Sequence, residues 1–490
     1  MVLTASDVAS MTRCEHRVYL DRFGNPDAKV PYPEFVQILW ESGRLHEEEV
    51  IADLSYVTPA GEDLDVRFES SIAAMAAGAP LIYHPFLKAN GLTGEPDLLK
   101  RVEQPSRFGA HCYVPVDIKA GGAWDNPNAK KLKAKPHYIS QLCAYAEMLG
   151  LIQGVTPTTG YVIDADGQWV LLDLLDFWPE YEGLRETARR FASGAQVTGP
   201  AKKADCDQCV WFDACDRELR EREDVTLVAG VGQSAQARLW QLGVKTVSQL
   251  AEADPALLVT VKGIGPASAE KWTRQARVQK GANAEVRQRW SPPRVRYDVS
   301  YDIENFVFDG SVYLHGLLVR PAGTTPFGTP MHVVTDWGHF DAICATAGET
   351  QESVWHRFLA RVEEIDSLAD YVVYVYSSHE QTHLAKLRAR HGSSAALDRF
   401  TSRFVDLYDV VRNHFVFPTE GTSLKDIARF CGFSWRDRDP GGSQSIAWWA
   451  YYLKDPAANA HLRDRVIAYN EDDVRASLAI RDWMERAALL

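Results

Sequence analysis

The feature that most constrains this chain is a strand pattern that occurs twice, each time with two charged residues two positions apart. In "VPVDIKA" the charged residues are Asp117 and Lys119, and in "YDIENF" they are Asp302 and Glu304. Alternate residues of a β-strand point to the same face of its sheet, so each pair addresses one cleft. Strand and helix patterns surround both segments. We therefore predict an α/β multi-domain protein with two polar clefts.

Composition limits the classes of protein that fit. The chain has 490 residues, enough for two to four domains, and its formal net charge is −13. This acidic balance counts against binding of nucleic acid through overall charge, so any basic surface must be local. Asp7 interrupts the N-terminal segment, and no stretch approaches about 18 uncharged apolar residues. We expect a cytoplasmic protein that does not enter a membrane.

The chain divides by pattern into four segments. Residues 1–220 mix helical and strand patterns, and residues 221–280 contain short helices. Residues 281–296 lack apolar periodicity and carry a Pro-Pro pair, which predicts a linker. Residues 297–490 begin with strands and continue with helices, which predicts a second α/β domain.

The first cleft draws candidate residues from separate stretches of residues 1–220. His46, Asp97 and Asp117 are candidate ligands for Mg²⁺ or Mn²⁺. Lys119 can orient or help to deprotonate an attacking water. Gln141 and Tyr145 are four positions apart in a predicted helix and share a face, where they can steady the lysine or grip a substrate.

The order of the motifs "GRLHEEE", "GEPD", "VDIK" and "QLCAY" resembles the RecB-like branch of the PD-(D/E)xK nucleases. The resemblance implies a restriction-endonuclease-like fold for residues 1–220, with His46 as a metal ligand. It also implies catalytic roles for Lys119, Gln141 and Tyr145. Glu47 is the neighbouring alternative to His46, because related enzymes use an acid there.

Four cysteines are candidate ligands for a second kind of metal centre. Cys206, Cys209 and Cys215 form a C-x2-C-x5-C cluster, and Cys14 is the natural fourth ligand. A zinc ion would satisfy this count and spacing. One distant cysteine with a three-cysteine cluster also resembles the iron–sulfur nucleases of the RecB-like branch, which implies a structural [4Fe–4S] cluster.

Two glycine hairpins follow the cysteines, each directly before a predicted helix. Their glycines are Gly230 and Gly232 in "VAGVG", and Gly263 and Gly265 in "VKGIG". The pattern resembles the helix-hairpin-helix motif, in which backbone N–H groups meet a DNA phosphate. The second hairpin opens a basic run in which we expect three residues to bind DNA, namely Lys262, Lys271 and Arg274.

The second cleft lies in residues 297–490. Asp302 and Glu304 share a strand face, and Tyr469 and Asp473 share a helix face. The set resembles the DEDD exonucleases of the ribonuclease H-like fold, closest to the YprB-like group, with Glu380 where an aspartate is usual. The resemblance implies metal ions held by the four acids and a water oriented by Tyr469. Two further acids are alternative ligands: Asp406 and Asp472.

Together these resemblances imply a metal-dependent deoxyribonuclease, an exonuclease on single-stranded or end-bearing DNA in repair or recombination. The chain has no G-x4-G-K-[ST] phosphate loop, so a helicase partner would be a separate protein. Two alternatives stay open: a non-catalytic nucleic-acid-binding scaffold, and a ribonuclease that acts through the second cleft on RNA. The sequence decides neither polarity nor endonuclease versus exonuclease action.

Overall fold

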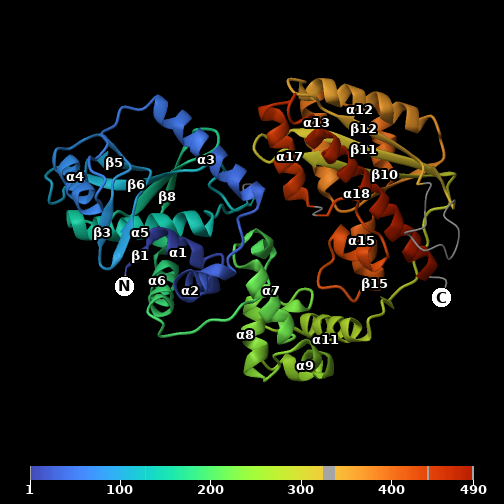
Figure 1. The fold of residues 1–490 in the computed structure, drawn as a ribbon, viewed down its shortest axis with the longest axis horizontal. Helices are drawn as coiled ribbons and strands as arrows, with labels where there is room; N and C mark the ends of the chain where they lie inside the picture. Colours follow the sequence, from blue (N-terminus) through green and yellow to red (C-terminus); the bar gives the residue numbers. More distant parts are fainter. Residues whose placement is uncertain (1, 127–128, 324–336, 439–440, 488–490) are drawn as a thin grey trace. The chain divides into compact units, whose positions relative to one another are not determined.

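The computed structural model describes four stretches of the chain, residues 2–126, 129–323, 337–438 and 441–487 (Figure 1). Two compact units make up the chain. The first consists of Met1–Pro200 with Cys206–Cys215, and the second consists of Ala201–Asp205 with Asp216–Leu490. No helix of the described stretches is both long and apolar enough to cross a membrane.

A five-stranded sheet forms the centre of the first unit. Its order is β2-β5-β6-β7-β8, and only the β6–β7 pair is parallel. The bounds are β2 Leu81–Tyr83, β5 Leu98–Val102, β6 Cys112–Ile118, β7 Thr159–Ile163 and β8 Trp169–Asp173. Every residue of β6 is buried, as expected for a central strand covered on both faces. A second, three-stranded sheet runs β1 (Leu3–Thr4), β4 (Leu92–Gly94) and β3 (Leu87–Ala89).

The helices of the first unit pack around these sheets. Their bounds are α1 Ala5–Met11, α2 Glu15–Phe23, α3 Glu34–Ala52, α4 Leu64–Ala76, α5 Pro136–Gln153, α6 Trp178–Ala192 and α7 Phe212–Glu221, the last of which runs into the second unit. The helix α5 is apolar on nearly every side and lies against β6. It ends at Gly154, whose φ of 79° is the left-handed conformation that glycine adopts without strain.

Short helices with their own apolar core form the first part of the second unit. Their bounds are α8 Gln233–Gln241, α9 Val247–Glu252, α10 Pro255–Leu258 and α11 Pro266–Gly281. Gly230 and Gly263 have left-handed φ values of 88° and 93°. Gly232 and Gly265 are the N-caps of α8 and α11. Both hairpins therefore use their first glycine to turn and their second to begin a helix, as the sequence predicts.

A second five-stranded sheet forms the C-terminal domain of this unit, in the order β12-β11-β10-β13-β14. The bounds are β10 Tyr297–Asn305, β11 Val312–Pro321, β12 His339–Cys344, β13 Tyr371–Val375 and β14 Phe404–Asp406. The strands β10, β11 and β12 are antiparallel, whereas β10, β13 and β14 are parallel. Within the predicted linker, β9 (Glu285–Val286) pairs with β15 (Phe415–Val416), a two-residue pairing too short to leave a sequence pattern.

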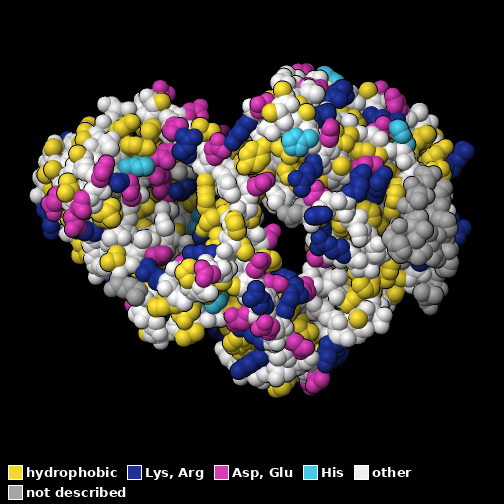
Figure 2. All heavy atoms as spheres, in the orientation of Figure 1, with side chains coloured by type: hydrophobic (Ala, Val, Ile, Leu, Met, Phe, Trp, Pro, Cys, Tyr) yellow, Lys and Arg dark blue, Asp and Glu magenta, His cyan; other side chains and the backbone are white. Residues whose placement is uncertain are grey.

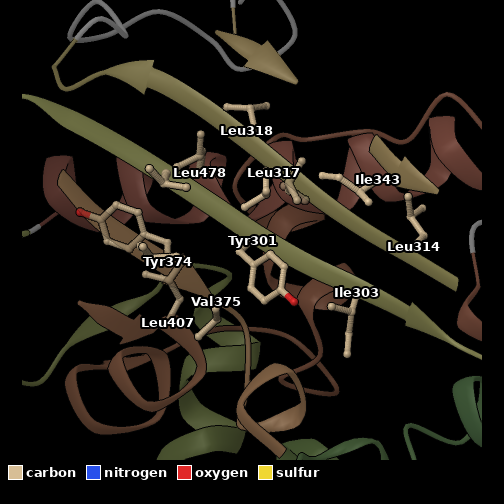
Figure 3. Packing of buried hydrophobic residues seen from close by; sticks show 14 of the residues in the cluster. Tyr301, Ile303, Leu314, Leu317, Leu318, Ile343, Tyr374, Val375, Leu407 and Leu478 are labelled. Carbon is tan, nitrogen blue, oxygen red and sulfur yellow. The ribbon is translucent and has the colours of Figure 1, made fainter. Parts of the chain in front are cut away.

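Helices cover both faces of this sheet. Tyr301 stacks on Phe358 of α12, while its neighbour Asp302 is bound by Asn470 of α18. Because adjacent strand residues point to opposite faces, α12 and α18 lie on opposite sides of β10. The core that results is shown in Figure 3. The helix bounds are α12 Gln351–Asp366, α13 His379–His391, α14 Ala395–Ser402, α15 Leu407–His414, α16 Leu424–Phe430, α17 Gly442–Lys454 and α18 Ala460–Ala487.

Candidate active site

Three carboxylates converge on the α18 face of the second sheet. Asp302 and Glu304 lie on β10, and Asp473 reaches them from α18. One oxygen of each residue lies within 4.8 Å of the other two. Three hard oxygen donors at this spacing suit a divalent cation such as Mg²⁺ or Mn²⁺. The structure thus brings together residues that are about 170 positions apart in the sequence.

The carboxylates repel one another strongly in this setting. Burial, followed by the charges of Asp473 and Glu304, raises the pKa of Asp302 well above its usual range. Burial raises the pKa of Glu304 to about 8, with a further rise from Asp473. Burial also raises the pKa of Asp473 to about 6. The group therefore favours bound protons or a bound cation over three bare charges.

Each carboxylate is oriented by a neutral donor. The Nδ2 atom of Asn470 donates to Asp302 at 2.7 Å, and Ser445 Oγ donates to Glu304 at 2.8 Å. Trp435 Nε1 donates to Asp473 at 2.6 Å. Donors of this kind fix ligand direction without neutralising the ligand charge.

Gly316 of β11 makes room for this arrangement. It lies opposite Asp302 in the antiparallel register. A Cβ at this position would lie 1.7 Å from Oδ1 of Asn470, so any larger residue must displace the asparagine. The sequence contains no pattern that marks this glycine.

Tyr469 lies one helical turn before Asp473 and hydrogen-bonds to it. Lys425 Nζ donates to Tyr469 Oη at 3.0 Å. Burial lowers the pKa of Lys425, although the charges of Asp473 and Glu304 act in the opposite direction. Sequence reasoning missed Lys425, because a single lysine in "TSLKDIARF" has no spacing relation to the acids.

Glu380 lies beside the group but outside the set of three oxygens. It follows β13 at the start of α13, and both Glu380 and Asp302 line a cavity of about 500 Å³. Burial raises its pKa to about 8, and it shares a hydrogen bond with Asp302. Its Oε2 atom is buried without a hydrogen-bond partner, which leaves it available to a cation or its water.

The two alternative ligands have other roles. The oxygens of Asp472 accept hydrogen bonds from the backbone N–H and Nε of Arg436, both at 2.8 Å. Asp406 accepts from the backbone N–H groups of Ser377 and Tyr408, both at 2.9 Å, and caps α15. Neither residue belongs to the set of three converging oxygens within the described residues, so their role as alternative ligands stays a prediction.

A second polar group occupies the first unit. Asp97 precedes β5, and Asp117 and Lys119 lie on and just after β6. Lys119 Nζ lies 2.7 Å from Asp117 Oδ2, as the strand spacing predicts. Burial and then Asp117 raise the pKa of Asp97 well above its usual range. Burial disfavours the charge of Lys119, but Asp117 and Asp97 outweigh it and raise its pKa. The lysine is therefore charged at neutral pH.

The structure does not place His46 with the ligand atoms that converge in this group. Its Nε2 atom lies 2.9 Å from the backbone oxygen of Asp164 and outside the group. The residues whose ligand atoms converge within 4.8 Å are Glu47, His84 and Asp97. Adjacent residues of a helix differ in direction by about 100°, so Glu47 faces the site and His46 does not. His84 was missed, because an isolated histidine in a loop carries no sequence signal.

Gln141 and Tyr145 share a face of α5, as predicted. Gln141 Nε2 donates to Tyr145 Oη at 2.9 Å, and Tyr145 Oη donates to the backbone oxygen of Glu95 at 3.1 Å. Glu95 is two residues before Asp97. The pair therefore supports the backbone that carries Asp97, and neither residue is hydrogen-bonded to Lys119 in the described stretches.

The described residues give no support for the predicted cysteine centre. Cys14 is the N-cap of α2, and Cys206, Cys209 and Cys215 lie in or near η3 (Ala204–Gln208) and α7. Burial raises the pKa of Cys209, with a smaller contribution from Cys14. Within the described residues, however, no group of three ligand atoms closer than 4.8 Å contains a cysteine. Neither the [4Fe–4S] cluster nor the alternative zinc ion is supported.

Comparisons with protein families assign two parts of the second unit. Residues 302–485 match the RNase_H superfamily, and this match spans all of the acids from Asp302 to Asp473. The C-terminal domain is a ribonuclease H-like domain. Residues 222–277 match the SAM-like helix-hairpin-helix tandem. No curated protein matches the chain. These two matches do not cover the first unit, so its resemblance to RecB-like nucleases stays a prediction.

Proposed function

We propose that the C-terminal domain hydrolyses phosphodiester bonds of nucleic acid, with Mg²⁺ or Mn²⁺ held by Asp302, Glu304 and Asp473. The carboxylate group carries this proposal, because a bound cation would relieve the repulsion between its crowded acids. The ribonuclease H-like domain and the helix-hairpin-helix tandem both point to a nuclease. A bound cation would activate water and stabilise the charge that develops on the phosphate.

The residues around the group have separable roles in this proposal. Tyr469 donates to Asp473 and accepts from Lys425, so it is fixed at the edge of the site. Lys425 has further N–H groups that can hold a water or a phosphate oxygen. Glu380 would complete the four-acid set, with its unpartnered oxygen toward the cation or its water. The proposed substrate is DNA that is single-stranded or has free ends, with a role in repair or recombination.

The test is cleavage of labelled single-stranded DNA, duplex DNA and RNA, each with Mg²⁺, Mn²⁺ or a chelator. The wild type cuts at least one substrate in the presence of metal, and the variants Asp302→Ala and Asp473→Asn bind it but cut it at a greatly reduced rate. The matched control is Asp472→Asn, which removes an adjacent acid bound to Arg436 and retains cutting. A wild type that binds all three substrates and cuts none would favour the scaffold alternative. Cutting of RNA alone would favour the ribonuclease alternative.

We also propose a second metal-dependent nuclease site in the first unit. The convergence of Glu47, His84 and Asp97 beside Asp117 and Lys119 favours it. Lys119 would orient water or phosphate through its charge, since its raised pKa makes it a poor base. Residual cutting by Asp473→Asn that disappears on the further change Lys119→Ala would support this site. A helicase is the proposed protein partner.

A further inference from the structure

A hollow of about 670 Å³ lies within the second unit, between α11 and the segment that contains α15 and β15. Its two walls are joined by Gln275 of α11, which is 8% exposed. The Nε2 atom of Gln275 donates to the backbone oxygens of Phe417 at 2.7 Å and Thr419 at 3.1 Å. Buried hydrogen bonds of this kind hold the helix-hairpin-helix module against the ribonuclease H-like domain.

Basic residues predominate among the charged residues that line the hollow. The hollow is lined by two carboxylates, Glu270 and Glu420, and by four cations, Lys271, Arg274, Arg287 and Arg412. Glu420 is already paired with Lys202 and Arg220. Within the described residues Lys271 and Arg412 form no ion pair, so their charges are available to an anion. Figure 2 shows lysine and arginine side chains gathered on the visible face of this unit.

The first glycine hairpin opens onto this hollow. Gly230 lines it, and Trp272 Nε1 donates to the backbone oxygen of Gly230 at 3.1 Å. A Cβ at Gly230 would lie 3.7 Å from Nζ of Lys271, so the lysine stands directly beside the hairpin. A phosphate held by the hairpin backbone would therefore also meet the ammonium of Lys271.

The hollow adjoins the cavity at the acids. Tyr408 and Thr422 line both this hollow and the 500 Å³ cavity that contains Asp302 and Glu380. The guanidinium of Arg412 lies 5.3 Å from the centre of the Tyr408 ring. Half-buried aromatic rings beside cations are the usual platform for unpaired bases, whereas a duplex keeps its bases inside.

We propose that this hollow is the binding track for one strand of nucleic acid, which runs from the hairpin at Gly230 past Arg412 and Tyr408 to Asp302. The proposal rests on the function proposed above and adds the route of the substrate. Lys271 and Arg412 hold backbone phosphates, and Tyr408 stacks on a base. The chemistry recognised is a single sugar–phosphate strand, which either DNA or RNA supplies.

The test measures binding of fluorescent single-stranded DNA and RNA 15-mers by the variant Asp473→Asn, with a chelator present to prevent residual cutting, over a range of salt concentrations. The further changes Lys271→Ala and Arg412→Ala together reduce the slope of log affinity against log salt by about 1.4, or about 0.7 for each lost phosphate contact. The matched control is Arg390→Ala, an exposed cation of α13 outside the hollow, and it keeps the slope. Lys271→Gln with Arg412→Gln gives a second pair, and thermal unfolding verifies that each variant is folded.

If the folded double variant keeps both its affinity and its slope of log affinity against log salt, the proposed binding track is wrong. An equal loss on DNA and RNA indicates recognition of the shared backbone, and a loss on one alone assigns the substrate. Cutting by the wild type is measured separately with Mn²⁺. If the wild type cuts and the double variant binds normally, the track is wrong and the nuclease proposal survives. If the double variant loses binding and the wild type never cuts, the track stands and the nuclease proposal fails.

Discussion

The acid groups of the two units differ in how their charges are balanced. In the first unit Lys119 forms an ion pair with Asp117, and a hydrogen bond from His84 lowers the pKa of Glu47. In the second unit Asp302, Glu304 and Asp473 receive neutral donors, and none of them forms an ion pair within the described residues. The first group is therefore partly neutralised by the chain, whereas the crowded acids of the second favour bound protons or a bound cation.

The largest effect expected from this difference is on cutting. Removing a ligand by Asp473→Asn should reduce metal-dependent cleavage by more than about 100-fold, since even the loss of an outer-shell partner costs 10- to 100-fold. The matching change in the first unit, Asp97→Asn, should cost less in a wild-type background. Initial rates with Mn²⁺ on one labelled substrate measure both. If Asp97→Asn loses more cleavage activity than Asp473→Asn, the site of the first unit contributes more to cleavage than the site of the second.

A smaller loss should follow from filling the space behind Asp302. Gly316→Ala puts a methyl group where Asn470 lies and removes the donor to Asp302. We expect a loss of about 10-fold to 100-fold in the affinity for metal. Titration of activity with Mn²⁺ gives the apparent affinity. The control Asn470→Ala should give a similar loss. If Gly316→Ala binds Mn²⁺ with wild-type affinity, the hydrogen bond from Asn470 does not contribute to metal binding.

Metal should stabilise the protein more through the acid group of the second unit than through the acid group of the first unit. Saturation at 100 times Kd corresponds to about 2.7 kcal/mol of added stability. Thermal unfolding with and without Mn²⁺ should show this shift in the wild type and most of it lost in Asp302→Asn. If the Mn²⁺-induced shift in unfolding temperature persists in Asp302→Asn and vanishes in Asp97→Asn, the acid group of the first unit is the stronger metal site.

The pH dependence of stability tests the repulsion among the acids of the second unit. Glu304 and Asp473 have ordinary pKa values of 4.5 and 3.8, and in the folded protein these rise to about 8 and about 6. The folded state thus binds more protons in this range, so the free energy of unfolding without metal falls as pH rises from about 4 to about 8. Denaturant titrations should show the fall, and Glu304→Gln should flatten it. A metal-free protein that gains stability over this range would contradict the raised values.

The smallest difference expected is between two neighbours on α3. Glu47→Gln removes a residue of the converging set, whereas His46→Gln removes only a contact to the backbone at Asp164. In the Asp473→Asn background, residual cutting should fall with Glu47→Gln and persist with His46→Gln. The opposite result would restore the histidine as the ligand.

The parts of the two sites that could be predicted are those with regular spacing. Two-residue spacing on a strand placed Asp302 beside Glu304, and four-residue spacing on a helix placed Tyr469 beside Asp473. His84 and Lys425 could not be found this way, because a loop and a helix start bring them in from isolated positions. His46 and its alternative Glu47 could not be told apart for a related reason: neighbouring helix positions point about 100° apart, and the sequence alone does not decide which one faces inward.

The most direct measurement is anomalous diffraction from crystals of the protein soaked in Mn²⁺ at a concentration that supports cleavage. The account predicts a peak bound by carboxylate oxygens of Asp302, Glu304 and Asp473. Crystals without a peak there, from protein that cuts nucleic acid at the same Mn²⁺ concentration, would contradict it.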